Sequence, residues 1–211
     1  MVSLLMEFLV AATESVVSCV EWTLAHLVIQ PEVQNKLRRE VVDDDGEHHR
    51  SGSTPYLRAV MLESLRLHPP VPLLMREVRT AVGVPEDLFL PATGGARVHF
   101  MLGHIGRDGK VWKEPDVFRP ERFMAGGEAE GVGPMPGPKE VRMMPFGAGR
   151  RSCPGMGLGM VHVGLFVAAL VRRFQWTAAA GGVDLTELDG LFKTKRTPLR
   201  VHATLRRRAS T

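Results

Sequence analysis

The chain has 211 residues, of which 44% are hydrophobic, so it can bury the core of one domain. Lysine plus arginine exceed aspartate plus glutamate by only 27 − 23 = 4, and this small, dispersed excess argues against nucleic-acid binding. Its two cysteines, Cys19 and Cys153, stand far apart, which argues against a disulfide framework and suits a reducing compartment.

The first predicted element is one long helix over residues 1–29, closed by Pro31. Its acidic residues Glu7, Glu14 and Glu21 recur at seven-residue intervals, which places them on nearly one face. We interpret that face as the solvent-facing side of a buried helix. No segment reaches the roughly 18–20 uninterrupted apolar residues of a membrane span, so no membrane anchor is expected in this chain.

Two more helices are predicted next, over residues 32–42 and 55–67, separated by a polar loop at 43–53. Residues 71–101 alternate short apolar runs with turn residues, as short strands do. Residues 103–145 predict a short helix, a compact meander and an exposed Gly/Pro/Glu-rich loop at 125–139. A strongly apolar helix is predicted over 156–176, and the last 35 residues are typical of β-hairpins. The fold class is therefore mainly α with a small β portion.

The predicted helix at 55–67 carries Glu63 and Arg66, three residues apart on one face. An isolated pair of this kind is usually a surface salt bridge. Here its neighbours are apolar, so the pair is also a candidate buried pair, which needs further hydrogen-bond partners. Arg122, in the sequence FRPERF at 118–123, is a candidate third member.

Cys153 lies in the loop PFGAGRRSCPG at 145–155, ahead of the apolar helix. Glycine and proline prevent a regular ladder here, while Arg150, Arg151 and the helix N-terminus favour a thiolate. A structural buried cysteine, a zinc ligand and a catalytic nucleophile are the alternatives. A zinc site would need other ligands nearby, of which His162 is the closest, and a nucleophile would need a base that the sequence does not show.

These motifs together resemble the cytochrome P-450 family of haem-thiolate monooxygenases. The resemblance rests on Glu63-x-x-Arg66, on PERF at 120–123 and on FGAGRRSCPG at 146–155, in this order. The run YLRAV at 56–60, leading into ESLRLHPP at 63–70, is most similar to plant microsomal members. The resemblance covers nearly the whole chain and implies the C-terminal part of that fold, as one partial domain over 1–211.

The resemblance implies roles for individual residues around a haem group. Cys153 would be the axial ligand of the iron, Phe146 would pack beside it, and Gly149 would let the loop approach closely. Arg151 and Arg76 would bind haem propionates, although Met75 stands where the family usually has proline before the latter.

The same resemblance makes Glu63, Arg66 and Arg122 a structural triad beneath the haem loop. It also makes residues 1–29 the long distal helix, in which Glu14 and Ser15 would help deliver protons. Ala12 stands where the family usually has glycine, and serine replaces the usual threonine. A solvent-facing role remains the alternative for Glu14.

The resemblance implies a monooxygenase that inserts one atom of dioxygen into a small organic substrate, with electrons from an NADPH-dependent reductase. The alternative is a truncated, non-catalytic remnant that retains the haem-binding motifs. Family members carry well over half their chain before the distal helix, so we expect exposed apolar surface along residues 1–28 and a tendency to aggregate. A complete member is expected at the cytosolic face of the endoplasmic reticulum membrane, and this chain alone in the cytosol or unstable.

Overall fold

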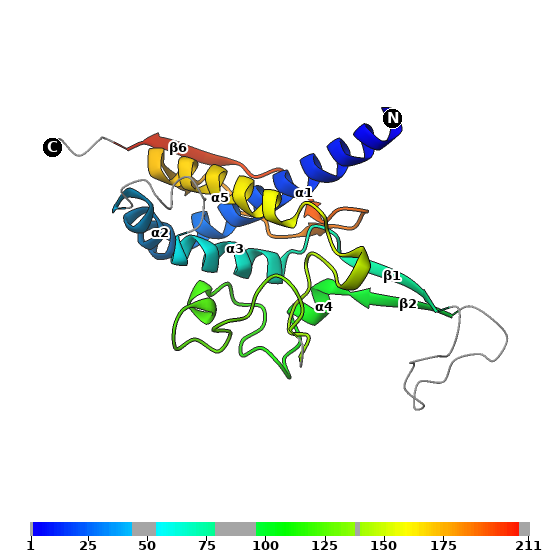
Figure 1. The fold of residues 1–211 in the computed structure, drawn as a ribbon. Coiled ribbons are helices and arrows are strands. Elements are labelled where there is room, and N and C mark those ends of the chain that lie inside the picture. The colour runs from blue at the N-terminus through cyan, green and yellow to red at the C-terminus, as the bar shows by residue number, and fades with distance from the viewer. Residues whose placement is uncertain (1, 44–53, 79–95, 138–139, 207–211) are drawn as a thin grey trace.

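The computed structural model describes residues 2–43, 54–78, 96–137 and 140–206. Within these ranges the body is built of helices, to which three two-stranded antiparallel sheets are attached (Figure 1). The prediction of a mainly helical chain with a small β portion is confirmed. The helices are α1 (Val2–Ile29), α2 (Pro31–Asp43), α3 (Pro55–Leu67), α4 (Leu102–Gly106) and α5 (Met156–Arg173).

Helix α1 has two different halves. Residues 2–14 are exposed all around the helix, whereas Trp22–Val28 are buried in the core. Figure 1 shows the N-terminal half of α1 extending beyond the other helices. The expectation of exposed apolar surface along residues 1–28 is therefore wrong for the second half. The helix face that carries Glu7, Glu14 and Glu21 is not solvent-facing over its whole length. Glu21 Oε1 accepts a hydrogen bond from the N–H of Leu199 at 3.0 Å.

By length and composition alone, α1 and α5 are each long and apolar enough to cross a membrane. The sequence prediction counted only uninterrupted apolar residues and so excluded both. Core helices of soluble proteins pass the same test, and the second half of α1 lies in the core.

Helix α3 lies at the centre of the molecule, against α1, α2 and α5. Only Pro55 and Arg58 are exposed in this helix, because its remaining side chains meet neighbours on every side. Helix α3 ends at Leu67 because Pro69 follows. The N–H of His68 donates to the carbonyl of Ser64 at 2.8 Å and closes the last turn.

The strands pair as β1 with β2, β3 with β6, and β4 with β5. Their bounds are β1 (Leu73–Val78), β2 (Ala96–Met101), β3 (Phe174–Ala178), β4 (Glu187–Leu188), β5 (Thr194–Lys195) and β6 (Val201–Leu205). The predicted helix over 156–176 is thus too long at its C-terminus, since α5 ends at Arg173. Residues from Phe174 onward form the ladder with β6, and the N–H of Trp176 donates to Gln34 Oε1 at 3.0 Å. Of the predicted loop at 43–53, residues 44–53 lie outside the described residues.

A buried histidine pair joins α1 to the end of α3. His26 Nε2 lies 2.9 Å from His68 Nε2, and His68 Nδ1 lies 2.8 Å from Glu187 Oε1 on β4. The His68 ring stacks on Trp22, with centroids 3.8 Å apart and planes 2° from parallel, and His26 stacks on Phe118. Four segments that are distant in sequence therefore meet around two imidazole rings.

Burial and nearby positive groups keep both imidazoles neutral. Burial lowers the pKa of His26 to about 3, assisted by His68, Arg107 and Lys195. The pKa of His68 is also lowered, chiefly by burial, against the opposing hydrogen bond to Glu187. Burial raises the pKa of Glu187, but hydrogen bonds from His68 and Lys193 and the charge of Arg107 outweigh it, so that its pKa is about 2.

The histidine pair predicts that the fold loses stability in mild acid. The pKa of His26 is about 6.5 in the unfolded chain and about 3 in the folded one. Below about pH 6.5 the unfolded chain therefore binds a proton at His26 that the folded chain does not, and the free energy of unfolding falls as pH falls. Between about pH 7.5 and about pH 5, His26 alone should contribute a loss of about 2 kcal/mol. Urea unfolding followed by circular dichroism measures it, and His26→Gln should flatten the pH dependence. An unchanged slope in that variant would contradict the assignment.

Candidate functional site

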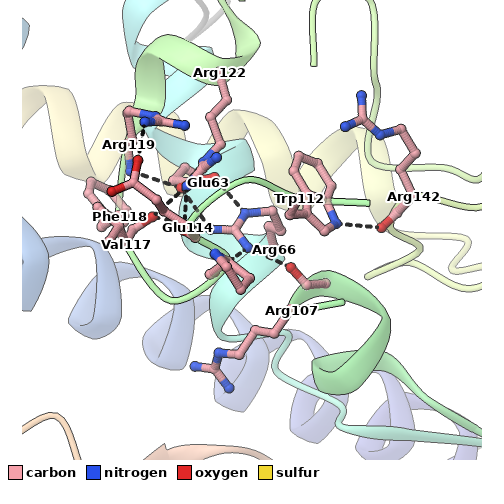
Figure 2. A network of polar contacts seen from close by, with 12 residues as sticks. Glu63, Arg66, Arg107, Trp112, Glu114, Val117, Phe118, Arg119, Arg122 and Arg142 are labelled. Carbon is pink, nitrogen blue, oxygen red and sulfur yellow. Dashed lines mark hydrogen bonds and ion pairs between the residues drawn. The ribbon is translucent and has the colours of Figure 1, made fainter. Parts of the chain in front are cut away.

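The carboxylate of Glu63 is the centre of a buried ionic cluster on α3. Arg66 donates to it through Nε at 2.7 Å and through Nη2 at 2.8 Å, and Arg122 donates through Nε at 3.1 Å. The N–H of Arg119 adds a fourth hydrogen bond at 2.8 Å. The side chains of Glu63, Arg66 and Arg122 are fully buried. Figure 2 shows the two guanidinium groups directed toward the one carboxylate.

The remaining N–H groups of Arg66 bind backbone carbonyls at the end of α4 and in the segment that follows it. Its Nη1 donates to Gly106 at 2.5 Å and to Pro115 at 2.7 Å, and its Nη2 donates to Val117 at 3.3 Å. A Cβ on Gly106 would lie 2.2 Å from the carbonyl oxygen of Arg66, so only glycine allows this approach. Because every guanidinium nitrogen has an acceptor, the cost of burying the charge is offset.

Arg122, in the 3-10 helix η2 (Pro120–Phe123), has a second carboxylate partner that sequence reasoning missed. Its Nη1 contacts Glu128 Oε1 and the carbonyl of Lys113, and its Nη2 donates to the carbonyl of Glu114 at 2.6 Å. Burial raises the pKa of Glu128, but the hydrogen bond from Arg122 and nearby positive charge outweigh it and lower the pKa.

The prediction that the loop at 125–139 is exposed is wrong at Ala129 and Pro134, whereas Ala125 and Gly126 are exposed. Ala129 is fully buried, and its N–H donates to the carbonyl of Arg122 at 2.8 Å. A Cβ on Gly127 would lie 2.3 Å from the carbonyl oxygen of Glu121, so this glycine allows the loop to fold onto the cluster. The glycine and proline content of the loop indicates exposure. Composition does not indicate the contacts with η2 that bury part of the loop.

Trp112 extends the cluster toward the segment that precedes the cysteine loop. The guanidinium groups of Arg66 and Arg142 lie 4.9 Å and 4.5 Å from the Trp112 ring centroid. Trp112 Nε1 donates to the carbonyl of Arg142 at 3.2 Å (Figure 2). Arg142 in turn donates to the carbonyl of Glu128 at 2.5 Å. The ionic cluster and the start of the cysteine loop are thus one connected unit.

The cysteine loop turns at two glycines whose backbone favours no other residue. Gly147 has φ +74° and Gly149 has φ +68°. The loop includes the 3-10 helix η3 (Gly149–Arg151), and the N–H of Cys153 donates to the carbonyl of Phe146 at 2.8 Å. Cys153 is a free, exposed thiol, which makes its sulfur available as a ligand.

Cys153 opens onto a cavity of about 300 Å³ that lies between the cysteine loop and α1. Phe146 and Arg151 line it from the loop, and Ala11 and Ser15 line it from α1. The lining is mainly apolar, which suits a flat hydrophobic cofactor or ligand. A thiol, an arginine and apolar walls around one space are a donor set that fits a haem group held through sulfur.

The other predicted site residues are not all brought to this cavity. Ser15 lines it, and its hydroxyl donates to the carbonyl of Ala11 at 2.7 Å. Glu14 is exposed and does not contribute to the lining. Arg76 lines a second hollow of about 370 Å³, where its Nη1 donates to the carbonyl of Met75 at 2.9 Å.

Cys19, which the sequence left without a role, lines the same cavity as Cys153. It is buried, and this burial raises the pKa of its thiol to about 12. The two cysteines therefore differ in exposure, and only Cys153 presents an accessible sulfur. Among the residues that the structure describes, no group of three or more His, Cys, Asp or Glu is placed to hold a metal ion.

The family model "Cytochrome P450" matches residues 1–201. "Cytochrome P450 89A9" of Arabidopsis thaliana is 41% identical over 196 residues, covering 88% of this chain and 38% of the relative. "Cytochrome P450 78A11" of Oryza sativa subsp. japonica is 40% identical over 220 residues, covering 99% of this chain and 38% of the relative. This chain thus spans about two fifths of the length of these curated relatives.

A solved structure of a zebra fish cytochrome P450 with progesterone has the same fold over most of this chain. Its TM-score is 0.72 at 27% sequence identity, and the match covers 95% of this chain and 44% of the zebra fish chain.

The ionic cluster predicts a large loss of stability when either central partner is removed. Glu63→Ala or Arg66→Ala leaves an unmatched buried charge, which should lower the free energy of unfolding by about 3–5 kcal/mol. The control is Asp189→Asn, which breaks an exposed pair with Lys193 and should cost at most about 1 kcal/mol. Urea unfolding compares the three variants, and equal small effects would show that the buried cluster is not stabilising.

A matched pair of glycines tests the packing of the loop onto the cluster. Gly127→Ala introduces a methyl group against two backbone carbonyls and should destabilise the fold by about 1–3 kcal/mol. Gly133→Ala, in the same segment, has no atom within 4 Å of the added carbon and should be nearly neutral. Thermal unfolding of both variants makes the comparison, and indistinguishable midpoints would contradict the close approach.

Proposed function

Because this chain belongs to the cytochrome P-450 family, we propose that it is the haem-ligating part of a haem-thiolate monooxygenase, with Cys153 as the axial ligand. The observation that carries this proposal is the cavity that has the exposed Cys153 on one wall and Ser15 of α1 on another. Haem bound through a cysteine thiolate supplies the activation of dioxygen in this family.

Glycines stand on both sides of Cys153 in the cysteine loop. A Cβ on Gly147 would lie 3.4 Å from Leu74 Cδ1, and a Cβ on Gly155 would lie 3.9 Å from Cys153 Sγ. Both distances are ordinary van der Waals contacts, so space alone does not require glycine at either position, whereas the φ of +74° does at Gly147. Phe146 lines the cavity beside it and supplies an apolar contact surface. Gly149 allows the turn at a φ that a residue with a side chain rarely adopts.

The propionate-binding role is better supported for Arg151 than for Arg76. Arg151 lines the cavity itself, and a guanidinium there would bind a carboxylate through two hydrogen bonds. Arg76 lines the neighbouring hollow instead. The two spaces are adjacent, because Leu74 lines both of them. We assign the first propionate contact to Arg151 and retain Arg76 as a proposed second contact.

On the opposite wall, Ser15 is the proposed proton-handling group. Its hydroxyl hydrogen is directed to the carbonyl of Ala11, so its oxygen remains able to accept a hydrogen bond from a molecule in the cavity. Glu14 is the neighbouring acid in the family pattern, but its exposure gives the proposed catalytic role no support from the cavity.

The proposed substrate is a small, mainly apolar organic molecule, because apolar side chains predominate around the cavity. Electrons would come from an NADPH-dependent reductase, and the complete protein would reside at the endoplasmic reticulum membrane, as the resemblance to plant members implies. The second candidate is a non-catalytic chain that retains the haem motifs. The exposed apolar side chains of Leu4, Leu5, Phe8 and Leu9 favour it, because a working site needs a closed wall there.

The two cysteines in one cavity provide the decisive experiment. The 211-residue chain is mixed with haem, reduced and exposed to carbon monoxide, and the absorption spectrum is examined for the red shift of thiolate ligation. Cys153→Ala should abolish the red-shifted band, whereas Cys19→Ala should retain it, since Cys19 is buried. Haem uptake with a spectrum unaffected by Cys153→Ala would overturn the assignment, as would the absence of any uptake.

A further inference from the structure

The loop between β4 and β5, residues 189–193, reaches the wall of the cavity and is here called the β4–β5 tip. Leu191 and Phe192 from this tip line the cavity. The side chain of Leu191 is 78% exposed, so its own burial cannot hold the tip in place. Strands β4 and β5 are only two residues long, and so short a ladder is insufficient for an ordered loop.

The backbone of Lys193 anchors the tip from both sides. Its N–H donates to the carbonyl of Pro70, just after α3, at 2.7 Å. Its carbonyl accepts two hydrogen bonds from α1, from Ser18 Oγ at 2.6 Å and from Trp22 Nε1 at 3.2 Å. Both donors belong to buried side chains, so the contact is shielded from water.

The side chain of Lys193 adds a second attachment. Its Nζ lies 3.1 Å from Glu187 Oε2 and 2.6 Å from Asp189 Oδ1. Glu187 is in turn held by His68 at 2.8 Å and by Arg107 at 3.2 Å. The anchor therefore extends from the tip to the buried histidine pair.

We propose that Ser18, Trp22 and Glu187 are positioning residues, which act through Lys193 to fix Leu191 and Phe192 as a constant wall of the cavity. This inference rests on the proposed function, in which the cavity receives haem and an organic substrate. The three residues would then determine the shape that a substrate meets, although none of them lines the cavity.

Hydrogen exchange of the whole 211-residue chain, read by mass spectrometry, tests the anchor. Ser18→Ala removes one of the two donors to the Lys193 carbonyl, and Trp22→Phe removes the other while keeping an aromatic ring. A hydrogen bond contributes about 1 kcal/mol, so each variant should accelerate exchange of residues 189–193 about fivefold. Exchange in α3 should stay unchanged in Ser18→Ala, whereas Trp22→Phe also removes core packing against His68.

The matched control is Thr197→Ala. It removes the hydrogen bond from Thr197 Oγ1 to Asp184 Oδ2 at 3.1 Å, outside the tip but in the segments that flank β4 and β5. Exchange of residues 189–193 should not change in this variant. Equal acceleration in the control, or acceleration in Ser18→Ala that extends to α3, would show general destabilisation and overturn the proposal.

A spectroscopic readout reports the position of the tip directly. The chain is labelled with fluorophenylalanine, and the Phe192 resonance is assigned by its loss in Phe192→Leu. Its chemical shift or width should change in Ser18→Ala and in Glu187→Ala, and not in Thr197→Ala. An unchanged resonance in the first two variants would overturn the positioning role.

The same samples, after haem addition, separate this inference from the proposed function. If the wild-type chain takes up no haem while the Phe192 resonance responds as expected, the proposed function fails and the anchoring stands. If haem binds through Cys153 while the resonance and the exchange rates stay unchanged, the proposed function stands and the anchoring is overturned.

Discussion

The buried carboxylate of Glu63 is the contact on which the rest of the structure depends. It holds two guanidinium groups and one backbone N–H, and so joins α3 to a segment that has little regular structure of its own. Between Arg107 and Met144 the described residues form turns and the short helix η2, and Trp112, Phe118 and Met143 of this segment are buried in the core. The ionic cluster adds directional contacts to this packing, and the cysteine loop begins where that segment ends. The position of Cys153 thus depends on a charge located on another element.

Local spacing made part of this site predictable from the sequence. Glu63 and Arg66 are neighbours on one helix, and the glycines around Cys153 indicate an irregular loop whatever surrounds it. Glu128 and the buried histidine pair were not predictable in the same way, because their contacts join segments that composition does not relate. The C-terminal end of α5 was predicted wrongly for a similar reason. The apolar pattern continues through Trp176, and only the pairing of Phe174–Ala178 with β6 makes that stretch a strand.

The cavity is assembled from parts that are far apart in the chain. Its walls come from α1, the end of α3, the cysteine loop, the start of α5 and the β4–β5 tip. Two of the contacts that hold these parts are polar: Glu63 joins α3 to the segment that precedes the cysteine loop, and Lys193 joins the β4–β5 tip to α1. This division explains how an apolar space can have a defined shape although most of its lining side chains make no directional bonds. The residues that line the cavity, such as Leu191 and Phe192, therefore differ from the residues that hold the lining segments in place, such as Ser18 and Trp22.

The contacts of the histidine pair also determine which ring donates the hydrogen bond between them. Glu187 is an ionised acceptor, so His68 Nδ1 must carry the hydrogen between them, and the neutral ring then has a bare Nε2. The bond to His26 can form only if His26 Nε2 carries its hydrogen, which leaves His26 Nδ1 without one. The Glu187 carboxylate therefore determines the tautomer of His68 directly and the tautomer of His26 through His68. A proton added to His68 would reverse the donor between the rings, and the tautomer of His26 would have to change with it.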